Sequence, residues 1–318
     1  MVFVKSVVEK MKKNKILLTI LLITISFFFF GCGRIKNESK YTIISTSFPG
    51  FDFSRAIVEG TDIDVKMLLK PGSEMHHYEP TPQDIIDIEK SDLFIYVGGD
   101  SDSWIDEVLS NINTDKVKIV KLMDLVELVK EEKVVGMEGE DSFEDDEHVW
   151  TSPRNAKIII EKLREFITDI DKDNSDTYLK NANNYISKIE AIDSEIKDII
   201  SSSKRKEIIF GDRFPLRYFA DYYGLDYYAA FPGCSEQTEA SAKTIAFLID
   251  KVKSDKIPVI FKIELSNGKI AETIANETGI KVLEFHSAHN ISQDDFDKGL
   301  TYVDIMKKNS IVLKEALN

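Results

Sequence analysis

Cysteine and histidine are scarce in this 318-residue chain. Its two cysteines, Cys32 and Cys234, allow one internal disulfide at most. The compact zinc motifs HExxH and CxxC are absent, and so is the glycine-rich Walker loop that binds ATP phosphates. With 43% hydrophobic residues, the chain can bury the cores of two globular domains, on the usual prior of ~150 residues each.

The first 31 residues have the layout of an export signal. Lysines precede an apolar run at residues 16–30, which is too short for a bilayer span of ~20 residues. The run ends in Gly31 and Cys32, a pair that resembles a bacterial lipoprotein cleavage site. This resemblance implies that Cys32 is acylated and that residues 32–40 form a tether. Cys234 would then lack a disulfide partner. The alternative is an uncleaved signal anchor.

The chain is acidic, with a formal net charge of −14. Removing the lysine-rich signal makes the remainder more acidic still, and such a surface repels nucleic acid and concentrates cations. Residues 138–147, EGEDSFEDDE, hold seven acids and no base. Such a run is typical of a solvated, mobile loop. The alternative is a loop that collects cations beside a metal site, since it ends immediately before His148.

Short β-branched or apolar runs alternate with amphipathic stretches from Tyr41 onward, which is typical of α/β units with parallel strands. Four strands are predicted at residues 41–49, 65–71, 92–98 and 117–122. Four more are predicted at residues 207–212, 225–231, 258–264 and 281–285. We therefore predict an α/β protein with an N-terminal lobe at residues 41–172 and a C-terminal lobe at residues 205–318.

The segment between the lobes, residues 173–204, predicts one long helix that Asn174 or Ser175 caps at its start. Its apolar residues recur at alternating spacings of four and three and form one stripe of Tyr178, Ala182, Tyr185, Ile189, Ile192, Ile196 and Ile199. About 25 helical residues span roughly 37 Å. A helix of that length predicts a stiff connection between the lobes.

All five histidines lie at predicted strand-to-helix junctions or turns, where α/β sheets bind ligands: His76, His77, His148, His286 and His289. Each alone is compatible with a loop imidazole that bonds a backbone carbonyl. Together they predict a metal site, because neutral imidazole is the commonest protein ligand of borderline divalent metals. Ligands at positions 76, 148 and 286 would come from both lobes, so we expect the site in the cleft between them.

Two motifs carry a family resemblance. Residues 72–82 match a Gly-x-x-x-His-x-Tyr-Glu-Pro-Thr-Pro run, and His148, Trp150 and Pro153 match a His-x-Trp pattern followed by a proline that opens a helix. The chain therefore resembles the metal-specific solute-binding receptors of bacterial ABC importers, the zinc and manganese receptor family. The resemblance covers residues 41–318. It implies two α/β lobes joined by one long, rigid backbone helix, and it selects His76 rather than His77 as the first ligand.

The resemblance also shows where this chain departs from the family pattern. Family members place a His or Glu ligand shortly before an aromatic segment that ends in Tyr-Gly-Leu, and here Arg213 occupies that position. Arginine cannot ligate zinc because it stays protonated, so the neighbouring Asp212 becomes the candidate, with Glu264 or water as alternatives. Where the family commonly has a final Asp ligand, this chain has His286. Whether His77 or His289 assists stays open.

The resulting ligand set of His76, His148, His286 and Asp212 indicates zinc, because three imidazoles and one oxygen favour zinc over manganese. The resemblance implies a receptor that performs no chemistry. It would sit lipid-anchored on the outer face of the cell membrane, as a monomer, and deliver Zn²⁺ to a permease with a separate ATPase. The alternatives are a manganese receptor, a zinc hydrolase with Glu264 as its base, and a surface adhesin.

Overall fold

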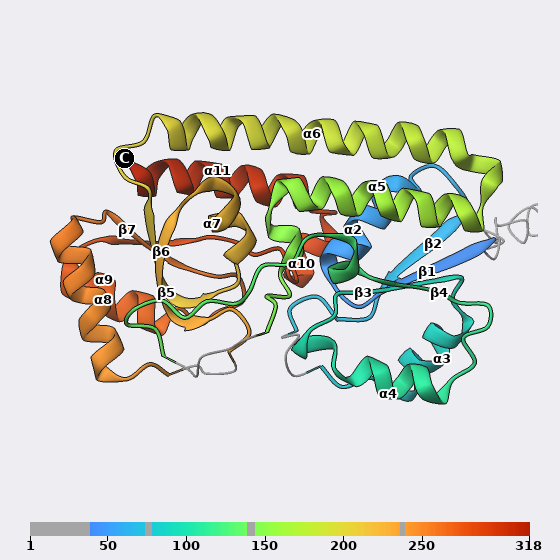
Figure 1. The fold of residues 1–318 in the computed structure, drawn as a ribbon, viewed down its shortest axis with the longest axis horizontal. Helices are drawn as coiled ribbons and strands as arrows, with labels where there is room; N and C mark the ends of the chain where they lie inside the picture. The colour runs from blue at the N-terminus through green and yellow to red at the C-terminus, as the bar shows by residue number, and fades with distance from the viewer. Residues whose placement is uncertain (1–38, 74–77, 139–143, 236–238) are drawn as a thin grey trace, which may run out of the picture. The chain divides into compact units, whose positions relative to one another are not determined.

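The computed structural model describes residues 39–73, 78–138, 144–235 and 239–318, and within these ranges it contains two four-stranded sheets (Figure 1). All strand pairs described are parallel. The first sheet has the order β2-β1-β3-β4, with β1 (Tyr41–Ser45), β2 (Ile63–Met67), β3 (Leu93–Tyr96) and β4 (Lys118–Lys121). The second has the order β6-β5-β7-β8, with β5 (Glu207–Phe214), β6 (Asp226–Pro232), β7 (Val259–Lys262) and β8 (Lys281–Glu284). The α/β class and the presence of all eight predicted strands are confirmed, but two strands were placed too far along the chain: β1 ends at Ser45, before α2 begins at Phe48, and β2 ends at Met67.

The strand order of both sheets predicts where a ligand would bind. β1 pairs with β2 on one side and β3 on the other, and β5 pairs in the same way with β6 and β7. The chain therefore winds outward in two directions from β1 and from β5. In such sheets the crevice beyond the carboxyl ends of the central strands is the usual ligand site. In β5 the register also shifts between Phe210 and Arg213.

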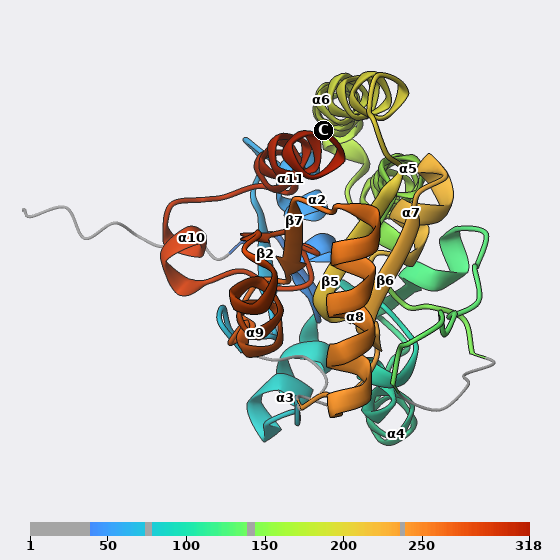
Figure 2. The ribbon, with the colours of Figure 1, turned by 90° about the vertical axis from the view of Figure 1, so that its left-hand side faces the viewer.

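Helices carry the chain between parallel strands, which cannot be joined by tight hairpins. Around the first sheet lie α2 (Phe48–Ile57), α3 (Pro82–Lys90), α4 (Trp104–Asn111) and α5 (Pro153–Ile170), with the short turns η2 (Asp100–Asp102), η3 (Leu122–Leu125) and η4 (Val149–Thr151). Around the second sheet lie α7 (Arg217–Tyr223), α8 (Ala242–Asp255), α9 (Lys269–Thr278) and α11 (Tyr302–Leu317). The short helix α10 (Gln293–Asp297) packs against α2, where Phe296 stacks on Phe51. Figure 2 shows α8 and α9 beside the second sheet.

Both faces of each sheet are buried. Successive side chains of a strand point to opposite faces, so neighbouring residues of one strand pack into different core clusters. In β5, Ile208 and Phe210 pack into the large core cluster that α6, α7 and α11 also enter, whereas Ile209 packs with α8 and α9. In β1, Ile43 joins the same large cluster and Ile44 joins a separate one. One core therefore continues from the first sheet to the second.

The predicted long helix is α6 (Ser175–Ser201), which has 27 residues, and its seven-residue apolar stripe is buried as predicted. α6 packs on α2 and α5 beside the first sheet and on α11 beside the second (Figure 1). Its Asp193 accepts hydrogen bonds from the Tyr222 and Tyr223 hydroxyls of α7, at 3.0 and 2.9 Å. With no glycine or proline in its interior, α6 is a rigid brace along both sheets.

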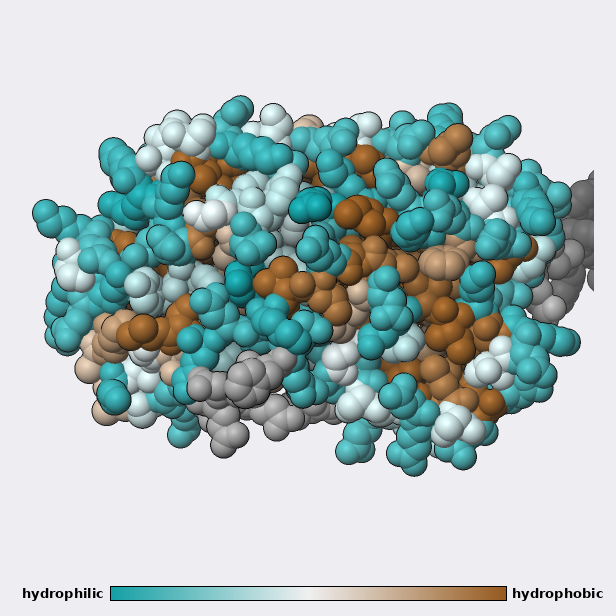
Figure 3. Space-filling model, in the orientation of Figure 1, coloured by the Kyte–Doolittle hydropathy of each residue, from teal (hydrophilic) through white to brown (hydrophobic). Residues whose placement is uncertain are grey.

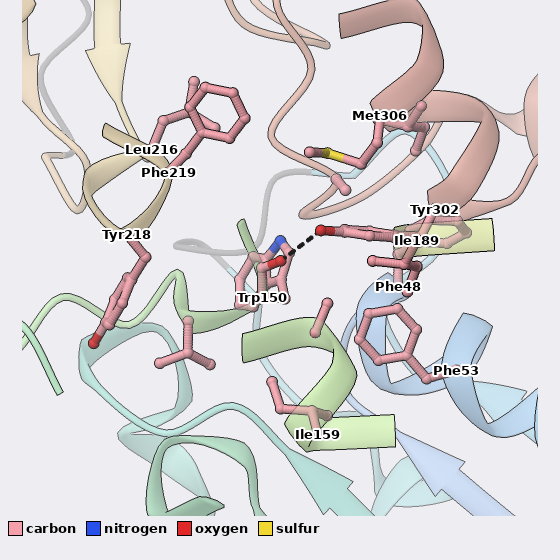
Figure 4. Close-up of a cluster of buried hydrophobic side chains, with 14 of the residues drawn as sticks. Phe48, Phe53, Trp150, Ile159, Ile189, Leu216, Tyr218, Phe219, Tyr302 and Met306 are labelled. Atoms are coloured by element: carbon pink, nitrogen blue, oxygen red, sulfur yellow. Dashed lines mark hydrogen bonds between the residues drawn. The ribbon is translucent and has the colours of Figure 1, made fainter. Parts of the chain in front are cut away.

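A group of fully buried aromatic side chains lies where the helices of the two sheets meet (Figure 4). The Tyr302 hydroxyl of α11 donates to the backbone oxygen of Trp150 in η4 at 2.8 Å. The Trp150 indole in turn donates to the backbone oxygen of Ser287, beyond β8, at 2.8 Å. This buried chain of hydrogen bonds fixes the turn after His148 against the loop that carries the last two histidines.

The face shown in Figure 3 is largely hydrophilic over α6, and hydrophobic residues gather lower, on the side of the first sheet. Among the helices that the structure describes, none combines the length and the apolar character needed to cross a bilayer. The predicted signal and tether, with Cys32, lie outside the described residues, apart from the last two tether positions.

Candidate metal centre

A small cavity of about 30 Å³ lies at the carboxyl ends of the strands of the second sheet. Its lining includes one residue at or just beyond the end of each strand of the second sheet: Arg213 in β5, Gly233 after β6, Glu264 after β7 and His289 after β8. Ser73 and His148 also line it. A cavity of this size holds a water molecule or a single ion. Its position agrees with the switch point between β5 and β7.

His148 is fully buried at the start of η4. Its Nδ1 lies 3.1 Å from Oδ1 of Asp146, which also accepts the backbone N–H of His148 at 2.8 Å. Because a carboxylate can only accept, Nδ1 carries the proton and Nε2 keeps the lone pair that a metal needs. Burial lowers the pKa of His148, but the Asp146 and Glu147 carboxylates together raise it by more, so its pKa lies above the ordinary value.

His289 lies directly beside His148. The two imidazole rings are 5.2 Å apart and nearly perpendicular, and the His289 ring is 5.0 Å from the Trp150 ring. The His289 backbone N–H donates to Glu264 Oε1 at 3.3 Å and to Ser287 Oγ at 3.2 Å. His289 was left open in the sequence as an assisting residue, and the structure brings it to the cavity with His148.

The predicted ligand His286 does not line this cavity. Its Nδ1 accepts the backbone N–H of Ala288 at 2.9 Å, so in the neutral ring Nε2 carries the proton and has no lone pair for a metal. Asn309 holds its backbone through bonds to both the N–H and the carbonyl, at 3.0 and 2.8 Å. Between the two histidines Ala288 has a φ of 61°, in the left-handed region that separates the directions of the two side chains.

The other predicted ligand, Asp212, is also outside the cavity lining. Its carboxylate accepts the backbone N–H of Arg213 at 2.9 Å and that of Ile263, beyond β7, at 3.4 Å. Burial raises the pKa of this carboxyl group. Asp212 therefore ties the ends of β5 and β7 together, and Arg213 is the residue of this pair that reaches the cavity wall.

Glu264, the alternative oxygen ligand and the candidate base of a hydrolase, accepts hydrogen bonds from the loop that follows β8. It lines the cavity, and its carboxylate accepts the N–H of Ser287 at 2.7 Å, the hydroxyl of Ser287, and the N–H of His289 at 3.3 Å. These bonds fix the loop from His286 to His289.

The acidic segment at residues 138–147 ends in two buried residues. Its composition predicts a solvated loop, and at these two positions that prediction is wrong. Asp146 and Glu147 are both 1% exposed. Glu147 accepts hydrogen bonds from the hydroxyl of Ser101 and, at 3.1 Å, from its backbone N–H. The burial of Asp146 follows from its bonds to His148. Residues 139–143 lie outside the described residues.

Cys234 is a candidate metal-binding residue that the sequence did not identify. One ligand atom each from Glu147, His148 and Cys234 lie within 4.8 Å of one another. Burial raises the pKa of the Cys234 thiol well above its ordinary value. No local motif marks these three residues, because Cys234 lies 86 positions from His148 and the two meet only through the fold.

His76 and His77 lie outside the described residues, but the residues that lead to them are at the cavity. Ser73 lines it, and the Asn290 side chain donates to the backbone oxygens of Lys70 and Ser73 at 2.9 and 2.8 Å. The Gly72 N–H also donates to the Ile291 oxygen at 2.7 Å. The loop of His289 thus fixes the first residues of the predicted motif.

Residues 43–316 match the family described as "ZnuA: Zinc-uptake complex component A periplasmic". The chain belongs to this family. It is 32% identical to the high-affinity zinc uptake system protein ZnuA of Bacillus subtilis over 292 residues, which is 90% of each chain. The family resemblance inferred from the sequence is confirmed.

Two further comparisons concern Streptococcus pneumoniae. The chain is 30% identical to the zinc-binding lipoprotein AdcA over 311 residues, which cover 96% of this chain and 61% of AdcA. This chain therefore spans about three fifths of that relative's length. The crystal structure of the Zn(II)-bound ZnuA-like domain of AdcA matches with a TM-score of 0.73 at 29% identity, covering 87% of this chain and 99% of that domain.

Proposed function

We propose that this chain is an extracytoplasmic receptor that binds one Zn²⁺ ion and delivers it to an ABC importer. The observation that carries the proposal is the convergence of His148 and His289 on a small cavity at the switch point of the second sheet. Membership of a zinc-uptake family and the zinc-binding names of its relatives support the choice of metal. The ion is cargo, so the receptor catalyses no reaction.

The proposed ligands are His76, from the sequence motif, with His148 and His289. The sequence also predicts His286 and Asp212, and these remain candidates that substitution can separate from His289. Asp146 would orient the His148 ring and make Nε2 a better donor, as carboxylate partners of metal-binding histidines do. Glu264 would hold His289 in place through the backbone of its loop.

The proposed partners are a membrane permease and a separate ATPase, with the receptor acting as a monomer tethered through acylated Cys32. Labelled palmitate added to producing cells should enter the wild-type protein and be absent from a Cys32→Ala variant. Labelling of both forms, or of neither, would contradict the proposed anchor.

The uptake function can be tested by deleting the gene for this chain in the cells that produce it. Such cells should grow normally in zinc-replete medium and poorly when a chelator makes zinc scarce. Added Zn²⁺ should restore growth, and added Mn²⁺ should not. A gene for the wild-type chain should also restore growth, whereas one for His148→Ala should not. Rescue by manganese alone would assign the receptor to manganese instead.

A further inference from the structure

Among the described residues, a second set of metal-binding side chains meets at His148. Glu147 and His148 are buried and Cys234 is half-buried, with one ligand atom from each lying within 4.8 Å of the others. A nitrogen ~2.0 Å and a sulfur ~2.3 Å from a tetrahedral zinc ion are ~3.5 Å apart. Small side-chain rotations would therefore let His148 and Cys234 bind the same ion.

The backbone of Gly233, immediately before Cys234, lies close to the imidazole ring of His148. A Cβ atom at Gly233 would lie 3.2 Å from Cε1 of His148 and 3.0 Å from the backbone oxygen of Phe214. Any other residue at this position would crowd the ring, so glycine permits the close approach. The N–H of Cys234 donates to Glu131 Oε1 at 3.3 Å, which fixes the thiol-bearing residue beside the cavity.

Strand pairing explains how the thiol comes to this edge of the sheet. Phe214 at the end of β5 is paired with Pro232 at the end of β6. Arg213 reaches the cavity from β5 but has no lone pair to offer a metal. Cys234 follows the adjacent strand, and Arg213 donates to the backbone oxygen of Ser235 at 3.4 Å. The end of the neighbouring strand thus supplies a donor atom beside Arg213, which offers none.

We propose that Cys234 supplies a sulfur ligand to the zinc ion bound by His148, an inference that rests on the receptor function proposed above. On binding, the thiol proton passes to solvent and a zinc–sulfur bond forms. Glu147 stays bonded to Ser101 and positions the turn. A thiolate is a soft ligand that favours zinc, whereas manganese prefers oxygen donors. Cys234 is therefore a determinant of metal specificity.

Zinc-edge X-ray absorption tests the proposal on the full chain carrying Cys32→Ser, in which Cys234 is the single thiol. The spectrum should contain one sulfur scatterer at ~2.3 Å beside nitrogen or oxygen at ~2.0–2.1 Å. The sulfur contribution should disappear in Cys234→Ser. In that variant zinc affinity should fall at least ~10-fold, the lower range for lost partners at metal sites, and the preference for zinc over manganese should narrow.

A matched control separates loss of the ligand from disturbance of its loop. Glu131→Gln weakens the acceptor of the Cys234 N–H but keeps the thiol, so it should retain the sulfur scatterer and most of the zinc affinity. Tight zinc binding through nitrogen and oxygen alone in the Cys32→Ser chain would overturn the sulfur ligand and leave the receptor function standing. Absence of tight zinc binding would overturn both.

Discussion

The two histidines beyond β8 should differ sharply in their contribution to zinc affinity. His289 lies beside His148 at the cavity, whereas His286 uses its Nδ1 to accept the Ala288 N–H. Replacing each by alanine in turn therefore tests which side chain ligates the metal. Both variants remove an imidazole from the same short loop, so each is a control for the other.

The expected magnitudes follow from the two environments. Zinc binds closed protein sites with about 10–16 kcal/mol, and an equal share among four ligands is about 2.5–4 kcal/mol, or roughly 60- to 700-fold in Kd. His289→Ala should lose affinity in this range. His286→Ala removes one hydrogen bond of 2.9 Å, which contributes about 0.5–1.5 kcal/mol. Its zinc affinity should therefore change by about tenfold at most.

The assay is a zinc titration in competition with a chelator of known affinity, with circular dichroism to confirm that both variants are folded. A much larger loss for His289→Ala is the expected result. If His286→Ala lost more affinity than His289→Ala, the ligand assignment from the structure would be wrong and the sequence prediction would be right.

Three further outcomes are expected. Because a zinc-binding histidine must be neutral and the pKa of His148 is raised, zinc affinity should already start to fall above pH ~6.5 when the pH is lowered. Asp146→Asn should shift this fall to lower pH and weaken binding at neutral pH ~10–100-fold, and an unshifted pH profile would contradict the role of this carboxylate. His76→Ala should abolish tight binding and His77→Ala should have little effect; equal losses in titrations of the two would refute the motif alignment. Tyr302→Phe leaves a buried backbone carbonyl without its donor and should lower the free energy of unfolding by about 1–3 kcal/mol in urea, and an unchanged unfolding midpoint would show that this bond adds no stability.

The strands and α6 could be predicted because their signals are local. The apolar stripe of α6 repeats along one helix face, and residues such as Ile208 and Ile209 are apolar in succession because both faces of the sheet are buried. Element ends were harder to predict. Asn174 is the N-cap residue of α6, but its side chain donates to Asp171 at 2.7 Å and makes no capping hydrogen bond.

The site was harder to predict because its geometry depends on contacts between distant segments. Sequence spacing alone does not show that the left-handed Ala288 separates the directions of His286 and His289, or that Glu264 fixes their loop. It also does not show that Cys234 meets His148, since the approach depends on the pairing of β5 with β6. Local patterns identified the histidine-bearing loops, whereas tertiary contacts determine which side chains face the cavity.

The account's central claim is that the cavity beside His148 is one high-affinity zinc site. Titration calorimetry of the purified, metal-free protein with Zn²⁺ and a competing chelator measures this directly. We expect one Zn²⁺ per chain with a Kd below about 1 μM, corresponding to more than about 8 kcal/mol, and loss of that site in His148→Ala. A wild-type protein with no such site, or a site that His148→Ala leaves unchanged, would contradict the account.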